Sequence, residues 1–446
     1  MNEQKYIALY NEQVETIKKN SATAFNTERD YFFAQFQDLG FPNKKTKNYR
    51  NTDFSQALST EYSLNLHRVE MDVDPEKLFH CDVPNIQSNL YFVVNDMYYD
   101  YETEKNVLPE GVIVCGMKTA SEQYPELVEK HLAQQSKRQK DAFVAFNGAL
   151  AQDGFFMYVP KNVIAERPIQ LVNMMCGKED IMVNSHNLII VEDGAQAQLV
   201  ICDHAMDDAN YFANRVTEVF VGENAIYNQY TIEISNKKMN NICTLLLDQK
   251  ANSNTNCNTI TLHNGLTRNH IQVDFQGENG EAKLSGTMLG DDKQLIDNTT
   301  TINHNMPNCV SYELFKYILD ENSLGVFNGI LRVLPDAQKT AAYQTNKNIL
   351  LTNTAKVRTQ PQLEIYADDV KCSHGSTTGQ LDETALFYMR QRGIAEREAR
   401  LMLMFAFVSD VIDYIHFDPL KDKVRYLVEK RLKGDMSFCS TCNICH

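Results

Sequence analysis

Between residues 143 and 380 the chain consists of many short apolar and β-branched segments separated by Gly, Asn and Asp, with almost no helical periodicity. Similar turn sequences follow three of these segments, at residues 192–195, 222–225 and 277–282. The glycines of the first two turns, Gly194 and Gly222, are 28 residues apart. One coil of a β-solenoid needs a comparable length for its short strands and turns. We therefore predict a stacked parallel β-helix, although a large antiparallel sandwich would contain similar segments at shorter spacing.

Helical patterns lie on both sides of this β region. Apolar residues within 3–19 are at helical spacing, and a second helix should end at Gly40. The segment that follows combines short strands, at 91–94 and 112–115, with a polar helical stretch over 121–140. The fold class is therefore mainly β, and the chain divides into an N-terminal helical and mixed region (1–142), a β-helix core (143–380), a C-terminal helical domain (381–434) and a cysteine-rich tail (435–446).

Three helices are predicted after residue 380. Asp382 can cap the first of them, and Gly434 can end the last. The second covers about residues 395–415, and its segment 401–408 is apolar on every side, so we expect that segment to be buried. Such a helix beside an amphipathic one either packs internally or offers a partner protein a docking surface.

The composition excludes several classes of function. Lys and Arg number 43 against 58 Asp and Glu, and the net charge of −15 disfavours nucleic acid or an anionic membrane as the main partner. The first residues lack a signal-peptide pattern, and no segment has the roughly 18 apolar residues of a membrane span. We therefore expect a cytosolic protein whose eleven cysteines are reduced.

The stretch 361–380 contains the best pair of soft metal ligands in the β region. Up to Asp368 and Asp369, apolar residues alternate with polar ones, as in a strand with one buried face. After the two aspartates the alternation is shifted by one residue. We interpret the two aspartates as a corner between two strands. Beyond it Cys372 and His374 share one face, with side chains about 7 Å apart. This spacing lets them hold one soft metal or sulfur species, whereas a buried Cys and a hydrogen-bonded His would be ordinary core residues.

A second group of soft ligands ends the chain. Cys439, Cys442, Cys445 and His446 form a C-x-x-C-x-x-C-H cluster. Gaps of two residues let thiolates converge on one zinc ion or iron–sulfur species. An unstructured, redox-sensitive tail is the alternative. The sequence contains neither a G-x-x-x-x-G-K-[ST] phosphate loop nor an H-E-x-x-H zinc helix, so we expect a protein that is not an enzyme.

Several motifs resemble the SufB/SufD family of the Suf iron–sulfur cluster assembly system, and its SufD branch in particular. The resemblance is specific around the C-S-H-G motif, is firm over about residues 143–415 and is thin over 55–140. It is carried by Gly40-Phe41-Pro42, Tyr49-Arg50-Asn51-Thr52-Asp53-Phe54 (with Tyr49 where tryptophan is usual), Asn147-Gly148-Ala149-Leu150, Arg167-Pro168-Ile169, Phe327-Asn328-Gly329, Gln344-Thr345-Asn346 and the run from Leu350 to Asp382.

This resemblance implies a right-handed parallel β-helix flanked by helical regions. It also implies a non-catalytic scaffold subunit of a SufBCD complex, which pairs with a SufB paralogue through the β-helix and docks one SufC ATPase on its C-terminal helices. Cys372 and His374 fall on the C-S-H-G motif, whose histidine faces the SufB interface where a transient iron–sulfur cluster forms. No tightly bound cofactor is expected. The resemblance leaves open whether the isolated chain forms a homodimer.

Two other functions are compatible with parts of the sequence. A SufB-like paralogue would share the fold, but such chains continue with E-A-T-T where this one has Gly375-Ser376-Thr377-Thr378. A β-helix carbohydrate-active enzyme would use a carboxylate pair such as Asp368 and Asp369. Adjacent residues of a strand point to opposite faces, so these two carboxylates could not flank one glycosidic bond.

Overall fold

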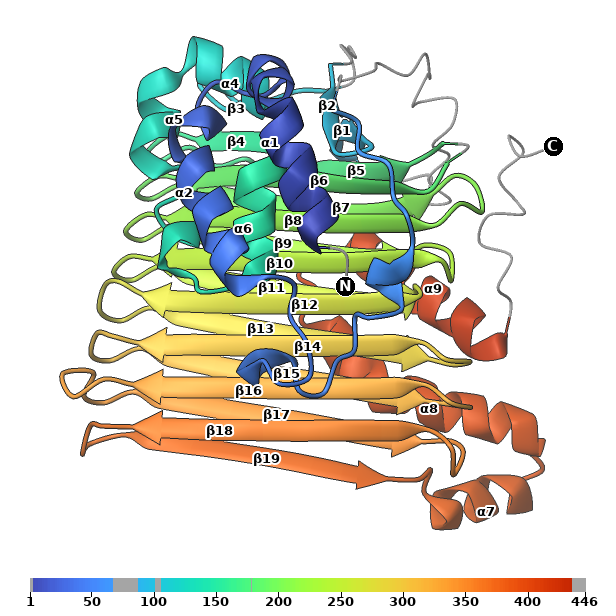
Figure 1. Cartoon of the computed structure of the whole chain (residues 1–446). Helices are drawn as coiled ribbons and strands as arrows, with labels where there is room; N and C mark the ends of the chain where they lie inside the picture. Colours follow the sequence, from blue (N-terminus) through green and yellow to red (C-terminus); the bar gives the residue numbers. More distant parts are fainter. Residues whose placement is uncertain (1–2, 67–86, 101–105, 178, 435–446) are drawn as a thin grey trace.

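The computed structural model describes residues 3–66, 87–100, 106–177 and 179–434. Its centre is a parallel β-solenoid in which the chain alternates between two sheets, so that about eight coils are stacked (Figure 1). This architecture confirms the predicted fold class. The ten-stranded sheet contains β1 (Asn89–Val94), β2 (Met97–Tyr99), β5 (Ile169–Met175), β7 (Gln196–Ala205), β9 (Ile226–Ile234), β11 (Asn254–His263), β13 (Glu281–Gly290), β15 (Val310–Leu319), β17 (Ala341–Leu350) and β19 (Lys371–Gly379). The nine-stranded sheet contains β3 (Ile113–Gly116), β4 (Phe155–Val159), β6 (Ile181–Val191), β8 (Tyr211–Val221), β10 (Met239–Gln249), β12 (Leu266–Phe275), β14 (Leu295–His304), β16 (Leu324–Val333) and β18 (Lys356–Ile365).

Apolar side chains stack in columns inside the solenoid. Val219, Leu247, Val273, Ile302 and Leu331 occupy the same register position in five successive strands of the nine-stranded sheet, and all are buried. The two sheets thus enclose one continuous core cluster. Because parallel pairing places equivalent positions above one another, each coil covers the apolar face of the coil before it.

The repeated turn sequences lie at one edge of the solenoid. Gly194, Asn224 and Asn252 there have φ values of 69°, 56° and 55°, the left-handed region that Gly and Asn adopt most readily. The N–H of each donates to a carbonyl of the following coil, as from Gly194 to Glu223 at 2.7 Å and from Asn224 to Ala251 at 2.9 Å. Gly194 and Asn224 are equivalent positions of successive coils and are 30 residues apart, and Asn224 and Asn252 are 28 residues apart. The 28-residue spacing seen in the sequence is therefore close to the length of one coil, although Gly194 and Gly222 are not themselves equivalent positions.

Helices cover the outer faces of both sheets (Figure 1). On the nine-stranded sheet, apolar side chains of the N-terminal helices pack on Met182, Phe212 and Ile242. On the ten-stranded sheet, the C-terminal helices pack on Tyr230, Ile260 and other apolar residues. The described helices are α1 (Glu3–Asn20), α2 (Phe25–Leu39), η1 (Lys47–Tyr49), η2 (Ala57–Ser59), α4 (Met117–Gln123), α5 (Pro125–His131), η3 (Ser136–Arg138), α6 (Ala142–Leu150), α7 (Glu383–Gln391), α8 (Glu396–Asp413) and α9 (Asp418–Lys433).

The N-terminal part of the chain is more closely joined to the solenoid than the sequence indicated. The predicted boundary between residues 142 and 143 falls at the start of α6, so a helix precedes the first strand of the core. The predicted strands at 91–94 and 112–115 are present as β1 and β3, and each joins one of the two large sheets. Among the described helices, none is long and apolar enough to span a membrane.

A buried ion pair fastens the motif around Tyr49 to the nine-stranded sheet. Arg268 pairs with Asp297, and Thr52 donates to the same carboxylate. The Arg268 guanidinium lies 4.2 Å from the centre of the Tyr49 ring, a cation–π distance. An aromatic residue is therefore needed at position 49, and tyrosine also donates its hydroxyl to Asp141.

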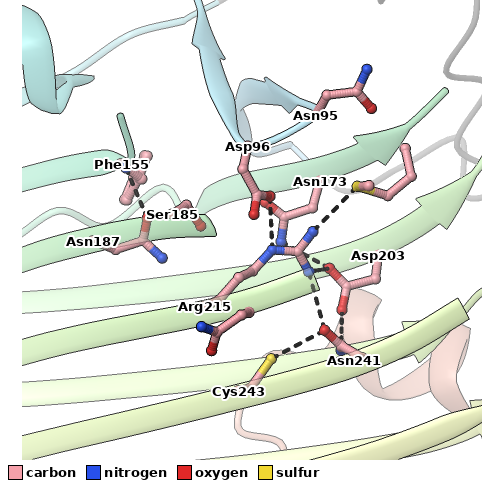
Figure 2. A network of polar contacts seen from close by, with 12 residues as sticks. Asn95, Asp96, Phe155, Asn173, Ser185, Asn187, Asp203, Arg215, Asn241 and Cys243 are labelled. Atoms are coloured by element: carbon pink, nitrogen blue, oxygen red, sulfur yellow. Dashed lines mark hydrogen bonds and ion pairs between the residues drawn. The ribbon is translucent and has the colours of Figure 1, made fainter. Parts of the chain in front are cut away.

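Polar side chains form a second network inside the solenoid (Figure 2). Arg215 of β8 donates from Nε to Asp96 at 3.0 Å and from a terminal nitrogen to Asp203 at 2.9 Å. Asp96 reaches the lumen from the turn between β1 and β2, where Asn95 and Asp96 both have positive φ. Further hydrogen bonds continue through successive coils, from Asp203 to Asn241, Glu233, Asn269, Asn298 and Tyr317.

Candidate functional site

Cys372 and His374 lie on β19, the last strand of the ten-stranded sheet. The strand follows a turn that contains Asp368 and Asp369, so the predicted corner is present. The register partners of Cys372 and His374 are Ala342 and Gln344 of β17, both buried in the lumen. Cys372 and His374 therefore share the inward face of β19, at an end of the solenoid that no further coil covers in the described part of the chain.

The two side chains differ in their surroundings. Cys372 is partly buried and packs against the core, and this burial raises the pKa of its thiol, while a hydrogen bond with the backbone of Ala342 acts in the opposite direction. His374 is exposed. A thiol with a raised pKa is a poor metal ligand until a cation displaces its proton. His374 is thus the more accessible ligand of the pair.

Beneath this pair, Gln344 and Glu313 form a polar floor. Both are inward-facing, at 1% and 3% exposed, and the Gln344 side-chain amide donates to the Glu313 carboxyl group. Burial raises the pKa of Glu313 to about 7. Gln344 was recognised only as part of a family motif, and Glu313 was not predicted as a site residue. Their parity within β17 and β15, which they share with the inward residues Ala342 and Phe315, is the signal that could have identified them.

Ser376 ties the last two strands together. Its hydroxyl donates to Oδ1 of Asn346 at 3.1 Å and shares a second hydrogen bond of 3.0 Å with the hydroxyl of Thr359 of β18, across the lumen. No group of three or more His, Cys, Asp or Glu side chains able to hold a metal occurs within the described residues. Cys372 and His374 would therefore need ligands from another molecule to complete a metal or cluster site.

The free edges of β18 and β19 surround the pair. Each strand is the last of its sheet, so one row of its backbone N–H and C=O groups has no partner strand in the described part of the chain. A Cβ built at Gly375 or Gly379 would meet nothing within 4 Å. Uncovered sheet edges of this length readily pair with a strand of another chain.

The C-terminal helices have exposed apolar side chains on their outer side. Asp382 caps α7 as predicted, because its carboxylate accepts from the N–H groups of Thr384 and Ala385. The expectation that the whole segment 401–408 is buried is wrong: Met404 and Val408 pack on the sheet, but Met402 is 53% exposed. Only one side of α8 contacts the sheet. Phe387 and Tyr388 of α7 are 63% and 59% exposed.

The remaining predicted residues do not enter this site. Cys439, Cys442, Cys445 and His446 lie outside the described residues. Asp368 and Asp369 lie in the turn before β19, where the N–H of Asp369 donates to Gln338. That turn joins β18 to β19.

Comparison with known proteins identifies the family. The model described as the SufBD core domain of SUF system FeS cluster assembly matches residues 174–407, and the SufBD N-terminal region model matches residues 1–171. The chain is 28% identical to an iron–sulfur cluster assembly SufBD family protein of Synechocystis, over 88% of each chain. It is 30% identical to SufD of Escherichia coli, over 66% of this chain and 71% of that protein. It is 25% identical to SufD of Bacillus subtilis, over 90% and 92%. This chain therefore belongs to the SufB/SufD family of iron–sulfur cluster assembly proteins.

Proposed function

We propose that the protein is a non-catalytic scaffold of the SufD type, which forms an iron–sulfur cluster assembly site together with a SufB-like partner. One observation carries this proposal: Cys372 and His374 face an open end of the solenoid, beside two free strand edges. Protein-bound iron–sulfur clusters take about four protein ligands. A pair of ligands at an uncovered edge suits a site whose other half comes from a partner, and whose cluster is held only transiently.

The partner most compatible with this end of the molecule is a paralogue with the same solenoid. Strands β18 and β19 offer backbone groups over about ten residues each, and a second solenoid could continue both sheets. The same edges could also pair with a second copy of this chain when the paralogue is absent. Reduced thiols are needed throughout, which places the scaffold in the cytosol.

We assign docking of the ATPase to the outer side of the C-terminal helices. The chain has no phosphate loop of its own, so ATP hydrolysis must come from a partner. Phe387, Tyr388 and Met402 are large apolar side chains more than half exposed. Anchors of this kind carry most of the binding energy at protein interfaces.

Phe387→Asp and Met402→Asp should each weaken ATPase binding at least about tenfold, because each removes an apolar anchor and places a charge in the interface. The tagged full-length chain is purified from its native cell, and bound chains are identified and quantified. Ile164→Asp is the matched control, since Ile164 is 50% exposed on the turn before β5. Co-purification of the ATPase with both helix variants at the level of the control would contradict the assignment. Truncation after Gln380 is a poorer test, because α8 and α9 cover apolar residues of the sheet.

The cysteine-rich tail is proposed as a separate metal site. Cys439, Cys442 and Cys445 are expected to bind one zinc ion under reducing conditions, because their spacing lets three thiolates converge and metal binding can order a short segment. Anaerobic zinc titration of the full chain should give one more equivalent than titration of a chain ending at Gly434. A triple Cys→Ser variant controls for the length of the tail. Equal stoichiometry for all three proteins would refute this site.

A further inference from the structure

The two free strand edges at the open end of the solenoid differ in the backbone groups that they offer. In a parallel sheet the N–H and C=O of one residue point to the same neighbouring strand, and those of the next residue point to the other side. One hydrogen bond of known direction therefore fixes the direction for every residue of a strand. Only the residues that point away from the sheet can pair with another molecule.

In β18 the even-numbered residues point to the sheet. Lys356 at its start and Tyr366 just after its end donate their N–H groups to the β16 side, at 3.0 and 2.9 Å. The odd-numbered residues from 357 to 365 therefore point to the free edge, and the middle one of them is Pro361. Because proline has no N–H, this edge lacks a donor at its centre, whereas the pairing of β18 with β16 loses nothing.

In β19 the even-numbered residues point to the free edge instead. Lys371 donates its N–H to Thr340 on the β17 side at 2.8 Å, so the odd-numbered residues of this strand point to the sheet. The residues that point to the free edge are Cys372, His374, Ser376 and Thr378. Each of the four has an N–H. The edge of β19 is thus an unbroken row of donors and acceptors, and it belongs to the residues whose side chains face the lumen.

Charged side chains mark the same difference between the two strands. Proline and charged residues on an edge strand protect it against pairing with another chain. In addition to Pro361, β18 carries Lys356, Arg358 and Glu364. In β19 the first residue is Lys371, and the others are Cys, Ser, His, Gly and Thr. The edge of β18 is therefore protected against strand pairing, and the edge of β19 is open to it.

We propose that β19, and not β18, is the strand with which the SufB-like partner pairs, through a backbone ladder along residues 372–378. The inference rests on the proposed function, which supplies this partner. Paired strands are about 4.8 Å apart, and residues opposite each other share one face of the sheet. The partner side chains opposite Cys372 and His374 therefore also face the lumen. Metal ligands at those positions of the partner would complete the site from the adjacent strand.

A second copy of this chain is a less suitable occupant of the same edge. Two identical solenoids that meet end to end about a twofold axis pair like with like. If β19 pairs with its own copy in this way, β18 also meets its own copy. The β18 side then receives two Pro361 residues, one from each chain, and the same charged side chains twice. A different solenoid brings neither of these features by necessity.

Amide hydrogen exchange, measured residue by residue on the full-length chain with and without the co-expressed SufB-like paralogue, tests the inference. The edge-facing N–H groups of β19 should exchange at least about tenfold more slowly in the complex, because a ladder bond must open before exchange. The edge-facing N–H groups of β18 are the internal control and should slow less than about threefold. Equal protection of both strands, or protection of β18 alone, overturns the inference.

Matched substitutions give an independent measure of the same difference. Ser376→Pro removes one edge-facing N–H of β19, and Ser376→Ala keeps that N–H while losing the same hydroxyl contacts. Ser376→Pro should bind the paralogue about tenfold more weakly than Ser376→Ala, the effect of losing one ladder bond. On β18, Thr359→Pro should bind within about threefold of Thr359→Ala. Equal losses on the two strands contradict the inference, and the exchange experiment decides if Ser376→Pro fails to fold.

Three further outcomes separate this inference from the proposed function. A complex that forms normally while β19 stays unprotected overturns the inference alone. Protection of β19 that rises with the concentration of the isolated chain, and does not increase with the paralogue, assigns the edge to a second copy and overturns the assigned partner. Normal cluster assembly by His374→Ala overturns the proposed site and leaves the exchange result standing.

Discussion

The variant His374→Ala should fold and assemble with its partners almost normally while cluster formation collapses. His374 is an exposed residue of the last strand, so its truncation should change the free energy of unfolding by less than about 1 kcal/mol. An imidazole is an intermediate ligand for iron, and its ring nitrogens can also accept and donate a proton. Loss of either role should reduce the cluster yield far more than the loss of stability can.

Thermal melting, co-purification and the yield of assembled clusters in the cell are measured on the same variant. Thr377→Ala is the control, since Thr377 is an exposed residue of the same strand on the outward face. Normal yield from a stable His374→Ala protein would remove this residue from the site. A yield that falls only in proportion to stability would indicate a structural role.

Cys372→Ser separates the two roles that remain open for the neighbouring thiol. Cys372 is partly buried against the core, and a small apolar filler replaced by a hydroxyl would lose stability. A ligand or sulfur carrier would lose cluster yield at nearly unchanged stability. Comparing the losses of stability and of cluster yield in Cys372→Ser with those in His374→Ala therefore assigns the role of the thiol.

Local patterns predicted the features of the fold that repeat. The similar turn sequences near residues 194 and 222 indicated the coil length because the turns at one edge of the solenoid recur once in every coil, about 28 to 30 residues apart. The shift in apolar–polar alternation at Asp368 and Asp369 predicted the turn before β19, because successive side chains of one continuous strand point to opposite faces. Helix α6 was missed because its segment, 142–150, is buried on all sides, and such a segment shows no helical stripe.

Features that depend on distant parts of the chain could not be predicted in this way. Residues 401–408 are apolar all round, yet α8 packs on the sheet with one side only, and the pattern alone does not reveal whether a partner covers the other side. Gln344 and Glu313 are 31 residues apart and become neighbours only through the register of β15 and β17. The contacts of this site could therefore be identified only after the stacking of the coils was known.

Arg215→Met should destabilise the protein more than any surface substitution. Arg215, Asp96 and Asp203 are each at most 5% exposed, and removal of the cation leaves two carboxylates buried without their counter-charge. Breaking a buried ion pair from one side typically costs about 3–5 kcal/mol. Denaturant unfolding of the full chain measures the loss. Arg332→Met is the matched control, because Arg332 pairs with Glu364 at 2.7 Å but is 39% exposed, and it should cost less than about 1 kcal/mol.

The same network also separates stability from cluster chemistry. Arg215 lies in the coils near β7 and β8, and Asp96 holds the β1–β2 turn over the lumen there, whereas Cys372 and His374 lie on the last strand at the other end. In a solenoid each coil contacts mainly its neighbours, so damage near β8 should leave the geometry of β19 intact. Asp96→Asn combined with Asp203→Asn in the Arg215→Met background should recover part of the lost stability, because the uncompensated charges are removed. Folded Arg215→Met protein should then assemble clusters at the normal yield per molecule. A loss of less than about 1 kcal/mol in Arg215→Met, or no recovery in the triple variant, would show that the charges of this network do not hold the coils together.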